Sequence, residues 1–446
     1  MWLRLRSATL ARAFVVGRTC RPAFRHYSAS ASVSASVRVS DPLRILFCGS
    51  DQFSCAALYA LHEEKKRNPS LIESLDVVIR PGKLTGRGMK TVREVPLKSL
   101  ASELNLPIYE RDTFTGWQPP IDFNLIIAVS FGLFVPKRLL SQAKYGGLNV
   151  HPSLLPDYRG SAPLQHTLLD NRTYTGVTLQ TLDPVAFDHG TVLSQTPLPG
   201  IPIPDHCTFQ ALHDIVTPLS AEMLVDGLRR GLHVPPVEDV GWKPTEDEMS
   251  RLRDAPKLTN HDRQVHFVLP SADWAVARQR VLGPLWCYMV RARDEKPVRL
   301  ILHDVQSVGR PVSMTPFMTW ALHRHRWDVP EGSHAQSAEA PSDESPKEDQ
   351  VVKSFEWALK LHPSDSIKNL CVRGRTPYWE DEDGSSILIP MNDQSCLKVP
   401  SITVEGSTAR PAAKVMSEFG NVAANDTDYW PYEELYSQLP NYFREC

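Results

Sequence analysis

Between residues 43 and 232, short apolar runs alternate with longer amphipathic stretches. The runs LRILFCGS, DVVI, LPIYE, FNLIIAVS and GGLNVH have the length and composition of buried strands. Between them lie QFSCAALYALHEEKK and VREVPLKSLASEL, in which apolar residues recur at helical spacing. Strands that alternate with helices predict an α/β domain, with a parallel-rich sheet covered on both faces.

The same domain is expected to end with two further strands and a long helix. GVTLQTLDP and GTVLSQTPL indicate a pair of strands joined by the loop from Asp183 to Gly190. TFQALHDIVTPLSAEMLVDGLRRGL then has the spacing of a long amphipathic helix. We therefore place the first domain at residues 43–232.

The composition changes after this helix. Residues 233–255 are rich in proline and charge and indicate a linker that partly wraps the surface. At 256–420, the helical stretch SADWAVARQRVL and short apolar runs such as CYMVRA, PVRLILHDV and SSILIPM predict a small, OB-fold-like β-barrel domain. Within it, the polar and acidic residues at about 331–350 predict a disordered insertion, and residues 421–446 form a C-terminal tail.

The N-terminal segment has a charge pattern of its own. Before Asp41 there is no acidic residue, and arginines recur among small and apolar residues. This pattern is typical of a mitochondrial transit peptide, so we expect residues 1–40 to be disordered and the protein to act in the mitochondrial matrix. A basic leader without a targeting role is the alternative. A secretory signal is disfavoured because arginines interrupt the apolar core.

The overall composition excludes several classes of protein. Hydrophobic residues at 42% and charged residues at 22% are ordinary for a globular protein, and no apolar run is long enough to insert into a membrane. The net charge of −2 provides no overall basic field for nucleic acid, so any RNA contact must come from local patches. The 8 cysteines form no C-x-x-C motif, which predicts free thiols and no metal site.

Two polar residues end the expected strand GGLNVH, where ligands bind in open α/β sheets. Asn149 and His151 are two apart and so point to the same side of the strand. Asn149 can donate to a carbonyl oxygen, and a protonated His151 can stabilise the oxyanion that forms when the carbonyl is attacked. Asp188, in AFDHG, can hold the imidazole if its loop folds back. The three predict an acyl- or formyl-transfer site without a protein nucleophile; a solvated strand end is the alternative.

The stretch GGLNVHPSLLPDYRGSAPLQ resembles the signature of the folate-dependent formyltransferases. LRILFCGS, TGRGMK, AVSFGLFVPK and FDHG follow in the family's order over about residues 43–235. The resemblance implies a Rossmann-like formyltransferase domain, and YRGSAPLQ is similar to the members that formylate methionine on initiator tRNA. It further implies that 10-formyltetrahydrofolate is the co-substrate and that the product serves mitochondrial translation initiation.

The resemblance also assigns roles to residues of this chain. Asn149 would hold the formyl oxygen, His151 would stabilise the tetrahedral oxyanion, and Asp188 would orient His151 and assist proton movement. Lys83, Arg87 and Lys90, in a basic loop, would contact the tRNA acceptor end. Contacts to the folate would come from Ser153, Leu154, Leu155, Pro156, Phe131, Gly132, Asp183 and Phe187.

Several alternatives remain open at the level of sequence. The same folate site could serve hydrolysis of 10-formyltetrahydrofolate or formylation of a small amine. A protein of another class, a non-catalytic RNA-binding protein on this fold, would not need Asn149, His151 and Asp188. Initiator methionyl-tRNA is the expected partner, and we expect a monomer. A second basic set that could face the tRNA comprises Arg278, Arg280, Arg291, Arg293, Lys296 and Arg299.

Overall fold

The computed structural model describes residues 38–86, 88–265, 267, 271–311, 353–360, 371–391, 393 and 395–422. The predicted transit peptide up to residue 37 lies outside the described residues. So do the predicted acidic insertion at 331–350 and the predicted tail from residue 423.

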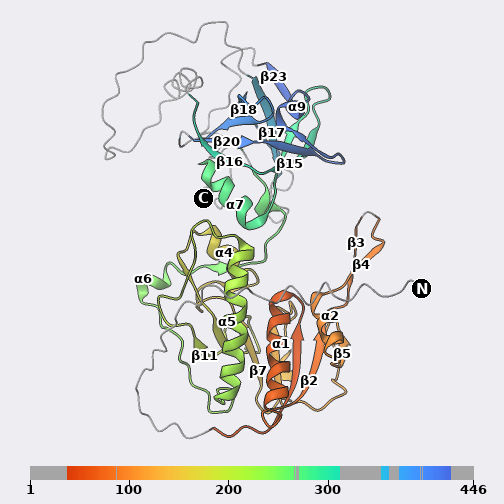
Figure 1. Ribbon diagram of the computed structural model, residues 1–446, viewed down its shortest axis with the longest axis vertical. Helices are drawn as coiled ribbons and strands as arrows, with labels where there is room; N and C mark the ends of the chain where they lie inside the picture. Colours follow the sequence, from red (N-terminus) through yellow and green to blue (C-terminus); the bar gives the residue numbers. More distant parts are fainter. Residues whose placement is uncertain are drawn as a thin grey trace, which may run out of the picture. The chain divides into compact units, whose positions relative to one another are not determined.

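A seven-stranded sheet forms the first half of the described chain (Figure 1). Its strand order is β11-β10-β7-β6-β1-β2-β5. The five strands from β7 to β5 are parallel, whereas β10 runs antiparallel to both β7 and β11. The predicted parallel-rich α/β fold is therefore confirmed. The strands are β1 (Leu43–Gly49), β2 (Ile72–Ile79), β5 (Ile108–Glu110), β6 (Leu125–Val129), β7 (Gly147–His151), β10 (Thr178–Thr181) and β11 (Val192–Gln195).

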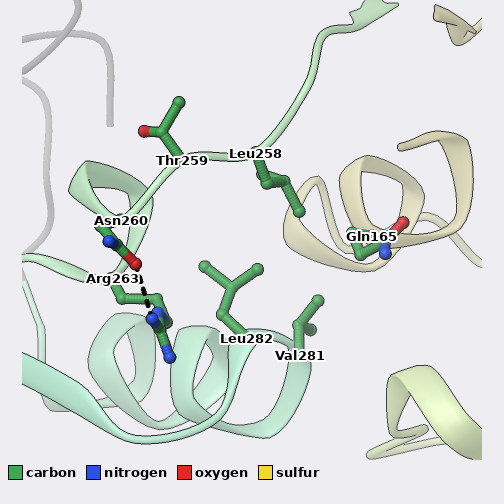
Figure 2. Close-up of a pocket in the computed structure, with 7 residues that line it drawn as sticks. All are labelled: Gln165, Leu258, Thr259, Asn260, Arg263, Val281 and Leu282. Atoms are coloured by element: carbon green, nitrogen blue, oxygen red, sulfur yellow. Dashed lines mark hydrogen bonds between the residues drawn. The ribbon is translucent and has the colours of Figure 1, made fainter. Parts of the chain in front are cut away.

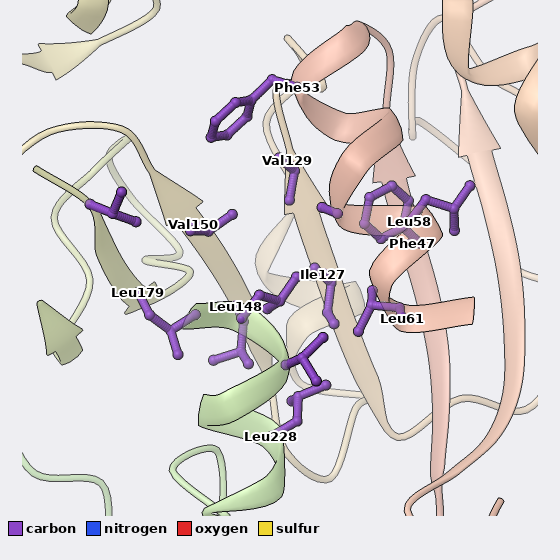
Figure 3. Close-up of a cluster of buried hydrophobic side chains, with 14 of the residues drawn as sticks. Phe47, Phe53, Leu58, Leu61, Ile127, Val129, Leu148, Val150, Leu179 and Leu228 are labelled. Atoms are coloured by element: carbon purple, nitrogen blue, oxygen red, sulfur yellow. The ribbon is translucent and has the colours of Figure 1, made fainter. Parts of the chain in front are cut away.

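Helices cover this sheet because its strands are apolar on both faces. On one face, Leu58 and Leu61 of a helix after β1 pack against Phe47 and Ile127, and Leu228 of a later helix packs beside Leu148 (Figure 3). A second cluster on the other face contains Ile126 of β6. The helices of this region are α1 (Gln52–Arg67), α2 (Pro96–Glu103), α3 (Lys137–Leu140), α4 (Pro163–Leu169) and α5 (Phe209–Arg229).

Local chemistry fixes where the two longest helices begin. The Asp51 carboxylate accepts a hydrogen bond from the backbone N–H of Ser54, and the Thr208 hydroxyl accepts one from Ala211. Each cap satisfies a backbone donor that the first turn leaves unpaired. Helix α1 begins directly after β1. Its start lies beyond the carboxyl ends of the parallel strands, where β7 also ends.

In the described chain, three short strand pairs lie outside the seven-stranded sheet. A hairpin of β3 (Lys83–Thr85) and β4 (Thr91–Arg93) carries the predicted basic loop. Strands β9 (Tyr174–Thr175) and β12 (Ile201–Pro202) pair antiparallel. Strand β8 (Arg159–Gly160) pairs in parallel with β13 (Asp254–Ala255), which lies near the end of the predicted linker.

The predicted linker contains more regular structure than its composition indicates. Helix α6 (Glu246–Met249) begins with a reciprocal capping box between Thr245 and Glu248. The backbone N–H of Val240 donates to Val192 of β11 at 2.9 Å. The segment is thus held by hydrogen bonds to the first domain.

A second, β-rich region follows, with a hydrophobic core of its own that includes Leu300, Phe355 and Ile402. Helix α7 (Ala272–Leu282), after the short 3-10 helix His261–Arg263, leads into a ten-stranded sheet of antiparallel neighbours. The β-rich character is confirmed; closure into a barrel stays a prediction, because the described strand pairs form an open path. The elements are β14 (Leu285–Val290), β15 (Pro297–His303), β16 (Gln306–Gly309), β17 (Lys353–Lys360), β18 (Cys371–Glu380), β19 (Ile387–Pro390), β20 (Ser395–Val399), β21 (Ser401–Val404), β22 (Ala409–Pro411), α9 (Ala412–Met416) and β23 (Gly420–Val422).

In the described ranges, no disulfide bond involves Cys48, Cys55, Cys207, Cys287 or Cys396. No helix in these ranges has the length and apolarity needed to cross a membrane. Within the same ranges, no three His, Cys, Asp or Glu side chains are grouped so that they could hold a metal ion.

Candidate active site

Asn149 and His151 lie at the carboxyl end of β7, between β6 and β10. The Asn149 side chain is half-buried, and its Nδ2 donates to the backbone carbonyl of Ala128 at 2.8 Å. His151 is buried, with 5% of its surface exposed. Because successive strand residues alternate between faces, both side chains reach the same side of the sheet, as the sequence predicts.

Both ring nitrogens of His151 face acceptors. Nε2 lies 2.9 Å from the carbonyl oxygen of Tyr158, and Nδ1 lies 3.4 Å from Oδ1 of Asp188. A neutral imidazole has only one N–H, whereas the imidazolium has two. Donation to both acceptors at once would therefore require the imidazolium, whose charge would lie against the Asp188 carboxylate.

Asp188 reaches the site from the loop between β10 and β11, as predicted. Its backbone has a φ of 58°, and its carbonyl oxygen accepts from Nε of Arg159 at 2.9 Å. Its Oδ2 accepts from the backbone N–H of Gly160 at 3.0 Å. These bonds hold the loop over the end of β7, so the structure brings Asn149, His151 and Asp188 together.

Gln180 of β10 is a buried neighbour of the site that the sequence analysis missed. It lies directly across from Asn149 in the antiparallel pair of β7 and β10. Its Nε2 is 3.1 Å from Oδ1 of Asn149 and 3.0 Å from Oδ1 of Asp188. The register of the two strands, which sets a glutamine directly across from Asn149, is the signal that could have found it.

The linker also contributes to the site, which the sequence analysis did not predict. The backbone N–H of Tyr158 donates to the carbonyl of Arg253 at 2.7 Å, and Ala162 donates to Ala255 at 3.1 Å. Gly160, at φ 127°, lies so close to this segment that a Cβ would be 2.3 Å from the Ala255 oxygen. The segment that holds His151 and Asp188 is therefore itself held by the linker.

Three of the predicted folate-binding residues have buried side chains. Phe131, Ser153 and Leu155 are at most 4% exposed, and the Ser153 hydroxyl donates to the Asp157 carbonyl at 2.7 Å. The Ser153 hydroxyl thus closes a local turn. The backbone N–H and C=O groups of Ser153 and Leu155 are also hydrogen-bonded within the protein.

The remaining predicted folate contacts are more accessible. Leu154 and Pro156 are half-buried, and Gly132 is exposed. Asp183 accepts from the backbone N–H groups of Ala186 and Val185 at 2.8 and 2.7 Å, and these bonds hold the pKa of Asp183 below its ordinary value. They fold the loop so that Phe187 is 58% exposed. A large apolar ring on an ordered loop beside Asp188 is suited to cover an aromatic ligand.

The predicted tRNA contacts lie on the hairpin of β3 and β4. Lys83 and Lys90 are exposed, whereas Arg87 lies outside the described residues. Leu84, Met89 and Val92 on the same hairpin are also more than half exposed. The hairpin therefore presents positive charge and apolar side chains together.

A separate hollow of about 450 Å³ is lined by residues of α4, α7 and the chain between β13 and α7 (Figure 2). Arg263 donates to Oδ1 of Asn260 at 2.8 Å at its rim. None of its lining residues belongs to the cluster around His151, so it is not where the predicted chemistry takes place. They are Gln165, Leu258, Thr259, Asn260, Arg263, Val281 and Leu282.

Comparison with known proteins identifies the family. The Formyl transferase family model matches residues 43–227. The mitochondrial methionyl-tRNA formyltransferase of Saccharomyces cerevisiae is 34% identical over 306 residues, which are 59% of this chain and 75% of the yeast protein. The chain belongs to the formyl transferase family. The resemblance read from GGLNVHPSLLPDYRGSAPLQ is thus confirmed, and the formyltransferase uses 10-formyltetrahydrofolate as its family does.

Another relative matches a smaller part of this chain. The human protein named mitochondrial methionyl-tRNA formyltransferase is 36% identical over 195 residues, 43% of this chain and 46% of the human chain. The match thus spans less than half of that relative's length. A solved sugar 3N-formyl transferase is 12% identical over 83% of this chain and 100% of its own, with a TM-score of 0.41.

Proposed function

We propose that this protein transfers the formyl group of 10-formyltetrahydrofolate to the α-amine of methionine carried by initiator tRNA, in the mitochondrial matrix. The observation that carries the proposal is the cluster of Asn149, His151 and Asp188 at the end of β7, with His151 3.4 Å from the Asp188 carboxylate. The family supplies the reaction type, and the names of the yeast and human relatives support the acceptor and the compartment.

In the proposed reaction the α-amine attacks the formyl carbon, and negative charge develops on the formyl oxygen. Asn149 donates one Nδ2 hydrogen to the Ala128 carbonyl, and its second Nδ2 hydrogen can donate to the formyl oxygen. A donor fixed in advance stabilises the developing charge without reorganisation. The bond from the formyl carbon to the folate nitrogen then breaks, and a proton passes from the amine to that nitrogen.

His151, held by Asp188, would also stabilise the negative charge that develops on the formyl oxygen. A protonated His151 would bring a positive charge to the end of β7, and the Asp188 carboxylate would hold the ring in one orientation. In this structure Nε2 donates to the Tyr158 carbonyl, so a formyl oxygen would compete with that carbonyl for the hydrogen. Hydrogen bonds of catalytic groups commonly tighten only in the substrate complex. Asp188 would also assist the proton movement.

The predicted folate contacts fit a flat, polar ring with a long tail. The backbone of Leu154, Phe131 and Gly132 would supply hydrogen bonds. That of Ser153 and Leu155 would not, because their N–H and C=O groups are bonded within the protein. The exposed ring of Phe187 would cover the pterin. Phe187 lies 5.2 Å from Phe134, centroid to centroid, and this edge contact stabilises its position.

Recognition of the tRNA would use two groups of cations. The hairpin offers Lys83 and Lys90. In the β-rich region, Arg278 lies over Trp274 at 4.2 Å and Arg299 over Trp286 at 4.5 Å, so each cation is supported by a ring. With a net charge of −2, the binding of the acceptor arm would depend on these local groups, and a monomer would suffice for it.

The test measures formyl transfer by the purified protein from 10-formyltetrahydrofolate to charged initiator tRNA, with free methionine as the competing acceptor. We expect tRNA-dependent formylmethionine, and a loss of about 10²–10³ in kcat for His151→Ala. Release of formate without transfer would indicate the hydrolase instead. Transfer at full rate by His151→Ala would overturn the assigned mechanism.

A further inference from the structure

Gln180 occupies a position that no assigned role explains. It lies on β10, between β7 and β11, and only 1% of its surface is exposed. A buried amide is costly unless its donors and its acceptor are paired. All of the polar contacts described for Gln180 lead to the site or to its loop.

A backbone group fixes the orientation of the Gln180 amide. The N–H of Gly190 can only donate, and it lies 3.2 Å from Oε1 of Gln180. Gly190 can approach so closely because it has no side chain: a Cβ there would be 1.7 Å from the Thr181 oxygen. Nε2 of Gln180 must therefore point the other way, toward Asn149 and Asp188.

The orientation of Asn149 is fixed in the same manner. The Ala128 carbonyl can only accept, so it binds Nδ2 of Asn149, and Oδ1 of Asn149 faces Nε2 of Gln180 at 3.1 Å. If the Asn149 amide turned over, its oxygen would face the Ala128 carbonyl and its nitrogen would face a donor. Gln180 thereby keeps the remaining Nδ2 hydrogen of Asn149 free for the formyl oxygen.

The second hydrogen of the Gln180 amide acts on Asp188. It reaches Oδ1 at 3.0 Å, the same oxygen that faces His151, while Gly160 holds Oδ2. One side chain thus connects the amide that would bind the formyl oxygen with the carboxylate that orients the imidazole. It touches neither the formyl group nor the ring.

We propose that Gln180 is a positioning residue for formyl transfer, which holds Asn149 and Asp188 in a single arrangement through the two hydrogens of its amide. This inference rests on the proposed function. It concerns the rate of the chemical step, because displacing a reacting group by about 1 Å can cost about 10²-fold. Substrate binding should change little, since Gln180 is buried behind Asn149.

The experiment compares Gln180→Glu and Gln180→Met in the full chain. Glutamate has nearly the shape of glutamine but places an oxygen against the two acceptors, whereas methionine keeps the volume and removes the donors. We expect kcat to fall about 10- to 10²-fold in both, with KM for 10-formyltetrahydrofolate and for the tRNA within about twofold. Gln264→Met, the same change at a buried glutamine of the β-rich region, is the control and should keep the full kcat.

The pH dependence distinguishes positioning from a general loss of packing. Burial and the neighbouring Asp188 raise the pKa of the carboxyl introduced by Gln180→Glu. As the pH falls, this group takes up a proton, regains one donor and loses its charge. We therefore expect the kcat of Gln180→Glu relative to that of Gln180→Met to rise toward low pH. A purely structural role would leave this ratio constant and would overturn the inference, as would a kcat within twofold of the unaltered protein in either folded variant.

The assay also separates this inference from the proposed function. Formation of formylmethionyl-tRNA and release of formate are recorded together for the unaltered protein. If the unaltered protein releases formate but does not transfer it, the proposed acceptor is wrong. The positioning role is then tested on formate release, by the fall in kcat of each variant and by the pH dependence of the ratio between the two variants. If it does neither, both proposals fail. If the unaltered protein transfers the formyl group and only the Gln180 variants are slow, both the proposed function and the positioning role are supported.

Discussion

The Asn149 amide has a single hydrogen to offer a substrate, because Ala128 takes the other one at 2.8 Å. Asn149→Asp keeps the shape of the side chain but replaces Nδ2 by an oxygen that faces the Ala128 carbonyl. We expect kcat to fall about 10²–10³-fold, which is the usual effect of removing one such donor. Steady-state formylation assays would measure it.

The control for this change is Asn171→Asp, at an exposed position after α4. It introduces the same charge away from the site and should leave kcat unchanged. An Asn149→Asp protein that is folded and retains at least half of the kcat would show that Asn149 does not bind the formyl oxygen.

The site residues differ in how readily a sequence shows them. Asn149 and His151 are neighbours on one strand, and a resemblance spanning many residues adds Asp188. Gln180 is visible only when β7 and β10 are set in register, because its function depends on facing Asn149 across two strands. Local sequence patterns do not show which residues face each other across two strands. The sequence therefore predicts Asn149, His151 and Asp188 but not Gln180.

At the scale of elements, the strands predicted from continuous apolar runs are present because burial on both faces leaves little choice of residue. The capped helix α6 and the strand β13 were instead predicted to be linker. Their residues have no apolar period, and β13 is ordered by long-range pairing with β8 rather than by its own composition. Burial patterns predicted the sheet, whereas contacts made by backbone alone could not be predicted.

The contact between β8 and β13 can be tested at Gly160. Gly160→Ala places a Cβ against the Ala255 oxygen, where only 2.3 Å is free, and at a φ of 127°. We expect the free energy of unfolding to fall by about 3 kcal/mol, because clash and backbone strain add. We also expect kcat to fall, because the N–H of Gly160 holds Asp188. Denaturant unfolding and formylation assays measure the two effects.

Gly116→Ala separates strain from contact. Gly116 also has a positive φ, of 68°, but nothing lies within 4 Å of a Cβ built there. This variant should lose only about 1 kcal/mol of stability and none of the activity. Equal effects of the two substitutions would show that the approach of the linker to Gly160 has no role in the site.

His233, just beyond α5, makes stability depend on pH. Its Nε2 bonds to the Ser40 hydroxyl at 2.9 Å, its ring meets Tyr145 edge-on, and no partner for Nδ1 is found among the described residues. Burial lowers the pKa of His233 from 6.5 to about 4. Between these values the unfolded chain takes up a proton that the folded chain does not.

The free energy of unfolding should therefore fall as the pH is lowered from 6.5 toward 4, by about 3 kcal/mol over the whole window. Urea unfolding at a series of pH values measures this slope. His233→Phe should lose the contribution and flatten the curve, whereas His206→Gln, at an exposed ring, should not. An unchanged slope in His233→Phe would assign the effect to other groups.

At the scale of the whole molecule, a net charge of −2 means that the protein as a whole does not attract RNA. Binding of tRNA must then depend on where the cations lie rather than on how many there are. The hairpin of β3 and β4 concentrates Lys83 and Lys90 on an exposed element, beside exposed apolar side chains that are insensitive to salt.

Replacing both hairpin lysines by glutamine should weaken tRNA binding and reduce the slope of log Kd against log salt concentration by about 1 for each lysine. A filter-binding titration at several salt concentrations would measure it. The matched control replaces Lys66 and Lys144, which are also exposed and form ion pairs with Glu63 and Asp41, so that the net charge changes by the same amount. Local recognition predicts a reduced slope only in the hairpin variant, because only those cations would release counterions from the tRNA backbone. Equal reductions in both proteins would instead show that the total charge governs binding, and would remove the hairpin from the proposed tRNA interface.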